Sequence, residues 1–334
     1  MTQDMKLYLF TLVLTLTGLI FILFIGLLPA LLAGLLTFLL IDFGAHRLSR
    51  IGVIPATGKI ILLALIAAVM IGVFTLVIIL LASEFTNGSE SFVALLQRMA
   101  DVVDTGRNYL PVWMGRYLPT NIEEWQVAVS EWLRGNASTL SLLGKEFGLT
   151  LIHIIFGMIL GGLIAITPDF TGKRGPFGQA LHERVLLLDN AFRRIVFSQI
   201  RISAVNTFFT ALFLGILLPL LGIYLPLVKT MIAVTFIVGL LPIIGNLISN
   251  TVIVIISLSI SPVAAVVSLV FLVVLHKFEY FMNAHIIGTQ IKAHAWEILL
   301  AMLVMESAFG ITGLVSAPIY YAYLKDELSE KKLI

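Results

Sequence analysis

Two stretches decide the fold, LLPIIGN at residues 240–246 and FGITG at residues 309–313, because each interrupts an apolar run with glycine. The four apolar arms beside these breaks hold 12 to 16 residues each, at 226–241, 246–260, 296–309 and 313–324. At about 1.5 Å of rise per residue, even the longest arm is shorter than a hydrocarbon core of about 30 Å. Each pair of arms therefore predicts a re-entrant hairpin, whose broken backbone has to be buried in protein or to line a polar cavity.

Composition places the chain among helical membrane proteins. Hydrophobic residues make up 59% of its 334 residues, charged residues only 12%, and the mean hydropathy is +1.06; a soluble domain carries about 25% charged residues. The sequence thus predicts an all-α polytopic membrane protein in contact with lipid. The apolar segment at 7–28 is expected to be retained as a membrane helix rather than removed as a signal peptide. A net charge of +2 gives no reason to expect a nucleic-acid partner.

Motifs of catalysis are missing from the sequence. The chain has no cysteine, which excludes disulfides, thiolate catalysis and cysteine-bound metal. It also lacks the phosphate loop of ATP-driven pumps, the paired histidines of a zinc-protease helix and the serine nucleophile elbow. We therefore expect a protein that is not an enzyme and that holds neither a cofactor nor a metal.

Apolar and polar stretches divide the chain into four predicted parts. These are N-terminal transmembrane helices at 1–83, an amphipathic extracytoplasmic insert at 84–148, a fourth span with a cytoplasmic amphipathic helix at 149–201, and a hairpin-containing transport region at 202–334. The predicted full spans are two within 7–41 and one each at 60–82, 149–167, 203–221 and 263–278. Gly157 and Gly161 form a small-xxx-small pair, which favours close packing between membrane helices.

Lysine and arginine residues set the orientation, because they concentrate on the cytoplasmic side of a membrane. Residues 84–148 hold five Lys/Arg against eight Asp/Glu, whereas residues 168–201 hold six against three. The insert is therefore expected outside and 168–201 inside, with both termini in the cytoplasm. The protein is expected to be a multi-pass protein of the cytoplasmic membrane.

Three topologies are open for the last hundred residues. If every arm crosses the membrane there are ten crossings, although the arms are short for this. If 226–260 and 296–324 are re-entrant, six full helices suffice and the basic connector between the hairpins lies inside. If each broken run is one kinked span, there are eight crossings, and Lys277 and Lys292 lie outside, against the positive-inside rule. We favour about six full transmembrane helices with two oppositely oriented re-entrant hairpins.

The hairpins carry most of the candidate functional residues. Residues at or near the two tips could hold a hydroxylated solute; they are Pro242, Gly245, Asn246, Asn250, Gly310, Thr312 and Gly313. A carboxylate within a membrane segment is a functional candidate, so Glu306, one turn before the second break, could bind a proton or a cation. Glu279, beside His276, is the second candidate for ion coupling. The alternatives are packing between helices for the polar residues and interfacial pairing for the carboxylates. Three polar residues of the fifth span are weaker candidates, expected to pack: Asn206, Thr207 and Thr210.

The order of these segments resembles a known family. LLPIIGN, then EYFMNAHIIGTQIKAHAWEILLAM at 279–302, then FGITGLVSAPIYYAYLK at 309–325 are similar to the autoinducer-2 exporter family of bacterial membrane proteins. The resemblance extends over nearly the whole chain in segment order. Positions that match the family's motifs are Pro242, Gly245, Gly288, His294, Gly310, Gly313 and Pro318. The chain departs from the family at Ala284 and Ala295, where members usually carry proline.

The resemblance implies a secondary transporter of the bacterial inner membrane. Each protomer of a homo-oligomer, expected to be a pentamer, would export a small polar signal such as autoinducer-2, used in quorum sensing, by an elevator-like movement of its hairpins. Some relatives are credited with sodium or lithium/proton exchange, so a monovalent cation/proton antiporter is the first alternative. A membrane scaffold or channel-like oligomer, whose broken helices serve assembly, is the second. Transporters place broken helices around their substrate, which favours transport.

Overall fold

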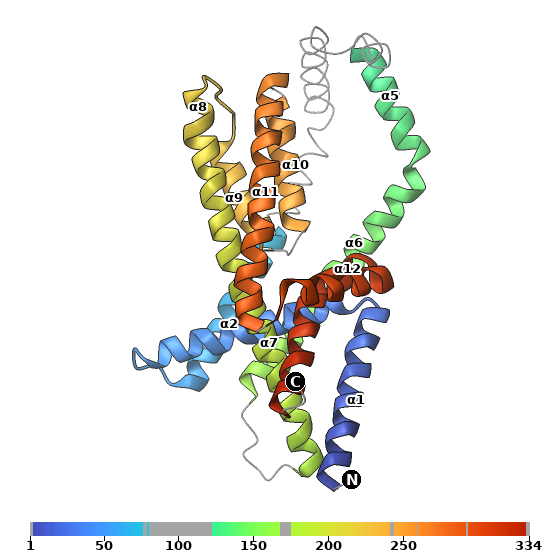
Figure 1. The fold of residues 1–334 in the computed structure, drawn as a ribbon, viewed down its shortest axis with the longest axis vertical. Coiled ribbons are helices and arrows are strands. Elements are labelled where there is room, and N and C mark those ends of the chain that lie inside the picture. Colours follow the sequence, from blue (N-terminus) through green and yellow to red (C-terminus); the bar gives the residue numbers. More distant parts are fainter. Residues whose placement is uncertain are drawn as a thin grey trace. The chain divides into compact units, whose positions relative to one another are not determined.

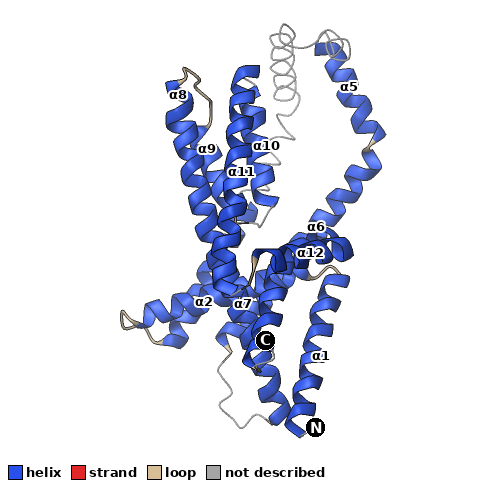
Figure 2. Ribbon diagram, viewed as in Figure 1, coloured by secondary structure: helices blue, strands red, loops and turns tan. Residues whose placement is uncertain are grey.

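The fold consists of helices and short turns. The computed structural model describes residues 3–75, 79, 122–167, 175–240, 244–258, 260–291 and 293–331, and these residues contain no strand (Figures 1 and 2). Seven helices in this part of the chain are long and apolar enough to span a membrane: Lys6–Phe24, Leu28–Ser49, Pro55–Thr75, Ala137–Ile166, Pro176–Leu220, Pro262–Glu279 and Trp296–Glu330. Six of them correspond to the predicted full spans, and the seventh is the second broken run. The predicted all-α polytopic fold is therefore confirmed.

The first two helices are separated by a sharp glycine turn. Helix α1 covers Gln3–Phe24 and α2 covers Leu28–Ser49. Gly26 lies between them with φ 72°, a conformation that residues with a Cβ rarely adopt. The polar stretch predicted to begin at Asp42 is still helical to Ser49, because the next proline occurs only at Pro55.

A close helix crossing joins α2 to the fourth span. Helix α5 covers Ile122–Gly135 within the predicted insert, and α6 covers Ala137–Ile166. A Cβ added at Gly157 would lie 2.0 Å from the backbone oxygen of Ala30, and one at Gly161 would lie 2.1 Å from that of Gly34. The glycine pair thus provides the close packing that its spacing predicts. The part of the predicted insert from residue 84 to residue 121 lies outside the described residues.

The long helix after the fourth span is continuous. Helix α7 covers Pro176–Leu212 and passes directly into a π-helical turn at Phe213–Leu217 and into α8 at Leu218–Leu220. The predicted cytoplasmic amphipathic helix at 177–200 and the fifth span at 203–221 are therefore parts of one helix. The reason is local, because neither glycine nor proline occurs between residues 179 and 214 to end it.

The first broken run folds back on itself as a helical hairpin. Helix α9 covers Val228–Val238 and α10 covers Ile244–Leu258. A Cβ at Gly245 would lie 1.9 Å from the backbone oxygen of Val238, so the start of α10 lies directly against the end of α9. The two arms therefore pack against each other. The hairpin shape is thus present, and the membrane face from which it enters stays a prediction.

The second broken run uses the same packing at its tip. Helix α12, Ala295–Glu330, is interrupted at Gly310, where φ is 62° and ψ is −144°, a backbone region open almost only to glycine. A Cβ at Gly313 would lie 1.9 Å from the backbone oxygen of Met305. Near the open end, Glu297 accepts hydrogen bonds from Tyr321 and, at 2.7 Å, from Lys325. The two arms of α12 therefore run back along each other.

Helix α11 connects the two hairpins in sequence. It covers Pro262–Ile291, so the basic connector that follows the predicted span at 263–278 continues as helix. Ala284, in place of the family's usual proline, leaves this helix without a break. Within the first hairpin region, Ser257 of α10 bonds to Ser268 of α11 at 2.8 Å, and Asn246 bonds to Glu279. The two contacts are separated by the same number of residues along α10 as along α11, and the residue numbers rise on one helix as they fall on the other. Helices α10 and α11 are therefore antiparallel and in register.

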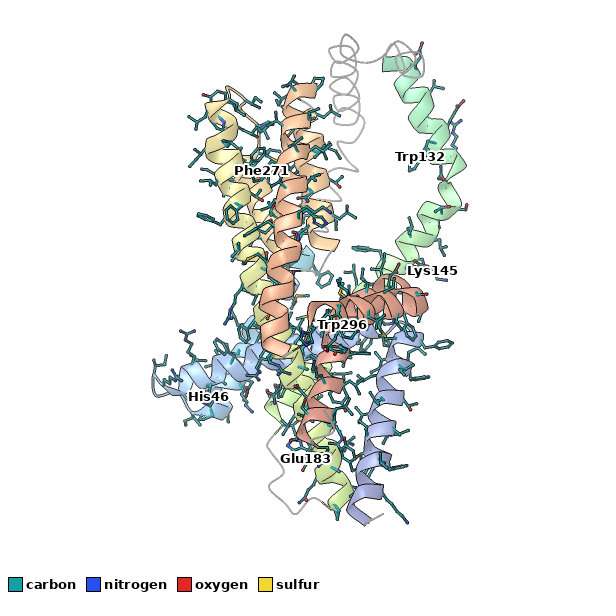
Figure 3. All side chains as sticks on the ribbon, viewed as in Figure 1. His46, Trp132, Lys145, Glu183, Phe271 and Trp296 are labelled. Carbon is teal, nitrogen blue, oxygen red and sulfur yellow. The ribbon has the colours of Figure 1, made fainter. Side chains whose placement is uncertain are left out.

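Contacts divide the chain into two compact units. One unit comprises Met1–Val73, Lys145–Ser198 and Ile287–Ile334, and the other comprises Phe74–Gly144 and Gln199–Ile286. In the first, a buried apolar core includes Leu19, Phe192 and Ile298. In the second, the core includes Phe213, whose ring stacks on Phe271 of α11 with centroids 3.9 Å apart. Figure 3 labels Phe271 on this helix.

A buried ion pair links three helices of the first unit. Arg184 of α7 and Glu327 of α12 are 1% and 0% exposed, and the Arg184 Nε lies 3.1 Å from the carboxylate. The hydroxyls of Tyr8 and Tyr323 donate to the same carboxylate, at 3.5 and 2.8 Å. The Tyr8 ring of α1 also covers the Arg184 guanidinium at 4.4 Å. Because the buried carboxylate of Glu327 has partners on α1, α7 and α12, the cluster fixes the end of α12 to α1 and α7.

Candidate functional site

A polar stripe on α7 faces the first hairpin. Gln199, Ser203, Asn206 and Thr210 follow one another at intervals of three or four residues, so they lie on one face of the helix. All four are buried. Burying a polar side chain costs free energy unless the side chain finds a hydrogen-bond partner. The partners of this stripe therefore show which part of the fold the stripe stabilises.

Two residues of the stripe cap the end of α9. Gln199 Nε2 donates to the backbone oxygen of Gly239 at 2.8 Å, and Ser203 Oγ donates to that of Phe236 at 2.7 Å. Carbonyls at the C-terminal end of a helix lack partners within the helix. Side chains of α7 therefore satisfy the backbone that the break at the hairpin tip leaves open.

A chain of three side chains crosses the hairpin tip. Asn206 Nδ2 of α7 donates to Asn246 Oδ1 at 2.6 Å, and Asn246 Nδ2 donates to Glu279 Oε1 of α11. Asn246 is 2% exposed and Glu279 is 6% exposed. Asn246 lies in the first turn of α10, so this amide joins the tip to both neighbouring helices at once.

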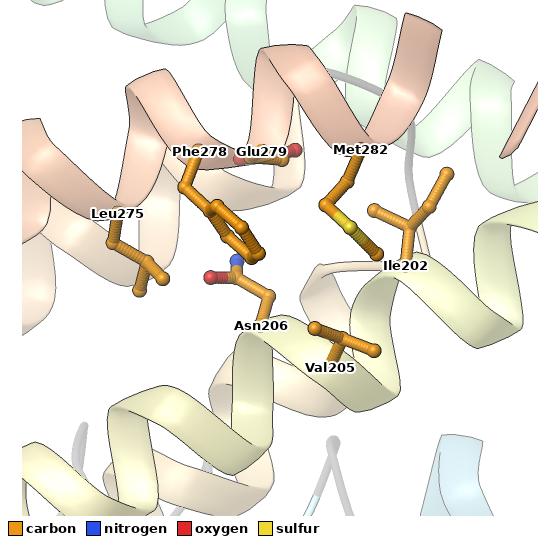
Figure 4. Close-up of a pocket in the computed structure, with 7 residues that line it drawn as sticks. All are labelled: Ile202, Val205, Asn206, Leu275, Phe278, Glu279 and Met282. Carbon is orange, nitrogen blue, oxygen red and sulfur yellow. The ribbon is translucent and has the colours of Figure 1, made fainter. Parts of the chain in front are cut away.

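The carboxylate of Glu279 borders a small, mostly apolar cavity. Asn206 and Glu279 are its polar lining residues, and the others are Ile202, Val205, Leu275, Phe278 and Met282 (Figure 4). Its volume is about 10 Å³, which is room for about one water molecule. His276, one turn earlier on α11, places its Nδ1 3.6 Å from Glu279 Oε2. The cavity thus holds a nearly buried carboxylate with an amide at one oxygen and an imidazole near the other.

Comparison with known proteins agrees with this architecture. Over residues 9–331 the sequence matches the profile of the AI-2E family transporters. The chain belongs to the AI-2E transporter family. A comparison with curated proteins finds no match. Membership makes this AI-2E protein a membrane protein of the transporter type, as the hairpin sequences predict.

Of the three remaining predicted residues of the first hairpin, two belong to the described part of the chain. Gly245 lies in the contact between the arms, and Asn250 is half-buried one turn beyond Asn246. Pro242 lies outside the described residues. The structure of the AI-2E protein thus brings Asn246 and Glu279 into direct contact, although the sequence assigned them to separate roles in binding solute and ion.

Candidate residues of the second hairpin belong to the other unit and form a separate set. Thr312 Oγ1 donates to the backbone oxygen of Phe309 at 2.8 Å, so this hydroxyl closes the turn at Gly310. Gly313 is buried against the first arm. Glu306 is exposed on that arm in the single chain. Their roles in binding solute or ion stay predictions.

Three residues of the stripe on α7 had a low rank or none in the sequence analysis. Asn206 was a weaker candidate, expected to pack between helices, and it is the first donor of the chain that ends at Glu279. Gln199 and Ser203 were not singled out. The sequence pattern that could have identified them is the helical spacing of polar residues along an otherwise apolar span. This spacing predicts a polar partner on that face of the helix.

The role of Glu306 can be tested by replacing it with glutamine. If Glu306 carries a proton or cation, Glu306→Gln abolishes transport or uncouples it from pH and sodium, because glutamine keeps the shape but does not titrate. Flux into liposomes, measured with and without pH and sodium gradients, checks this, and gel filtration confirms that the oligomer is intact. Unchanged flux with unchanged pH and sodium dependence rules out the coupling role.

Proposed function

We propose that this AI-2E protein is a secondary transporter that exports a small hydroxylated molecule, similar in chemistry to autoinducer-2, through an elevator-like movement of its hairpins. The observation that supports the proposal is the buried chain from Asn206 through Asn246 to Glu279 at the tip of the first hairpin. We further propose that it acts as a homo-oligomer, expected to be a pentamer, in the bacterial inner membrane with both termini in the cytoplasm.

The stripe on α7 offers atoms that a polar solute could bind. Asn206 Oδ1 and Thr210 Oγ1 are buried and make no hydrogen bond within the described part of the chain. A buried polar atom without a partner costs about 1–3 kcal/mol, so a hydroxyl group or a water molecule arriving here would be stabilised. The cavity that Asn206 lines has room for about one water molecule. A larger solute therefore requires the tip to separate from α11, which links binding to hairpin movement.

Exchange of a monovalent cation for protons is the second candidate function. The observation that favours it is Glu279, a nearly buried carboxylate that contacts the hairpin tip directly. In this alternative the ion is the cargo, and the hairpin moves without an organic solute.

One flux experiment separates these functions. Purified protein in liposomes is tested with a radiolabelled hydroxylated furanone, and in parallel with sodium and proton gradients followed by dyes. Saturable furanone flux supports export of a polar solute, and sodium-dependent proton movement without furanone supports exchange. Liposomes containing the Gly245→Ala variant serve as a matched control. Absence of both fluxes in folded, correctly oriented protein contradicts the proposal.

Topology of the first hairpin can be tested by cysteine labelling, because the chain has no native cysteine. If the hairpin is re-entrant from outside, Tyr224→Cys and Ile260→Cys both react with a membrane-impermeant maleimide in intact cells. Both side chains are exposed in the single chain. Permeabilised cells give the total reactive fraction. Reaction of one residue from outside and the other only after permeabilisation shows a crossing instead of a hairpin.

A further inference from the structure

We propose that Glu279 binds a proton and thereby acts as a latch for the first hairpin. In the unprotonated state the carboxylate holds Asn246 and keeps the tip closed against α11. Protonation weakens this contact and releases the tip. The inference rests on the proposed function only in assuming that the hairpin moves, and it assigns the proton as the ion that controls the movement.

Hydrogen-bond directions at the tip suit a charged carboxylate. Asn206 donates to Asn246, and Asn246 donates to Glu279, so both amides are polarised toward the carboxylate. Asn246 lies in the first turn of α10, where the helix dipole favours a negative charge. A hydrogen bond to an ionised group is about twice as strong as one between neutral groups. Protonation of Glu279 therefore removes much of what holds the tip.

The same contacts favour a proton over a metal cation. A cation needs oxygen lone pairs around it, whereas Asn246 presents an N–H group to Glu279. Five of the seven lining residues are apolar, and the cavity has room for about one water molecule. A proton needs no coordination shell. His276 Nδ1 lies 3.6 Å from the second carboxylate oxygen.

Charged groups around Glu279 are few among the described residues. Helix α7 faces it with Ile202, Val205 and Asn206, and α10 faces it with Asn246, none of which titrates. On α11 itself, His276 lies beside Glu279, and the exposed Lys277 precedes Glu279 by two residues. Variants of Glu279 and of His276 therefore have to be compared to assign the pH response.

The accessibility of introduced cysteines reports whether the hairpin tip is closed or released, and this measurement needs no transport. Ser249 is 1% exposed on α10 and Leu247, on the same helix, is 70% exposed. Ser249→Cys and Leu247→Cys, in the cysteine-free protein in detergent, are labelled with a small maleimide between about pH 9 and about pH 5. The ratio of the two rates cancels the intrinsic pH dependence of thiols in the part of this range where both thiols are mostly protonated. We expect this ratio to rise about tenfold toward low pH as the tip is released.

Variants assign the effect to Glu279. With Glu279→Gln the ratio is expected to be high at every pH, and with Glu279→Asp, which still titrates but reaches less far, pH dependence remains. A flat ratio in the otherwise unaltered protein, or an unchanged pH response in folded Glu279→Gln, overturns the proposal. Loss of the pH response in His276→Gln alone would identify the histidine as the sensor and overturns it as well.

A comparison of two salts distinguishes control of the tip by protons from control by sodium. At fixed pH, replacing choline chloride by sodium chloride is expected to leave the labelling ratio unchanged. A saturable sodium effect that is absent from Glu279→Gln would show a cation site and overturn the assignment to a proton. Because the measurement needs no solute gradient, its result is independent of the flux experiment. A working latch without flux would leave this inference intact and reject the proposed function.

Discussion

Arg184→Met is expected to lower the free energy of unfolding by about 3–5 kcal/mol, the usual cost of breaking a buried ion pair by removing one partner. Glu327 is 0% exposed, so it would be left as a buried charge bonded only to the hydroxyls of Tyr8 and Tyr323. The end of α12 would lose its buried pair with α7 and keep only the partly exposed pair between Arg194 and Asp326 among the described ion pairs. Denaturation in detergent, followed by circular dichroism and gel filtration, measures the change.

Two matched variants identify the cause. The double variant Arg184→Met with Glu327→Leu removes both charges and is expected to recover most of the lost stability, because apolar residues of similar volume replace a buried pair without large cost. Arg201→Met, at an exposed position of the same helix, is expected to change stability little. Equal stability of Arg184→Met and the unaltered protein would show that the pair does not hold α12.

Gly245→Ala is expected to open the first hairpin and abolish transport. The added methyl group would lie 1.9 Å from the backbone oxygen of Val238 and 2.9 Å from Gly239 Cα. Both are backbone atoms, so the arms themselves have to separate, and the contacts of Asn246 separate with them. We expect a loss of stability of about 3 kcal/mol, the upper end for overpacking. Flux in liposomes and melting temperature in detergent measure both effects.

A glycine in open space provides the control for this change. Gly148 of α6 has no neighbouring atom within 4 Å of an added Cβ. Gly148→Ala is therefore expected to leave flux unchanged and to keep or raise the melting temperature, since alanine is the better helix former. If Gly245→Ala behaves like Gly148→Ala, the close contact at the tip is not needed for the hairpin.

Local signals in the sequence were enough to predict the two hairpins. Gly245, Gly310 and Gly313 interrupt apolar arms that are too short to span the membrane, and the effect of a glycine on the backbone depends on its own conformation. The extent of α7 was readable in the same way, because no glycine or proline interrupts residues 179–214. The predicted split into an amphipathic helix and a separate span overlooked this.

Side-chain contacts between residues that are far apart in the chain could not be predicted from one sequence. Asn206 and Asn246 are 40 residues apart in the chain, and Asn246 and Glu279 are 33 apart. Their contact depends on which faces of α7, α10 and α11 meet, and apolar membrane helices carry little periodicity to show this. Arg184 was useful for orientation alone, while its burial against Glu327 follows from the packing of α1, α7 and α12.

The capping of α9 by α7 bears on how the chain enters the membrane during synthesis. Helices α9 and α10 have 11 and 15 residues, and at about 1.5 Å per residue neither can cross about 30 Å of hydrocarbon alone. The open carbonyls of Phe236 and Gly239 find their donors on Ser203 and Gln199, which emerge earlier from the ribosome. Insertion of this hairpin as a pair thus depends on a helix already in place, and the order of synthesis delivers that helix first.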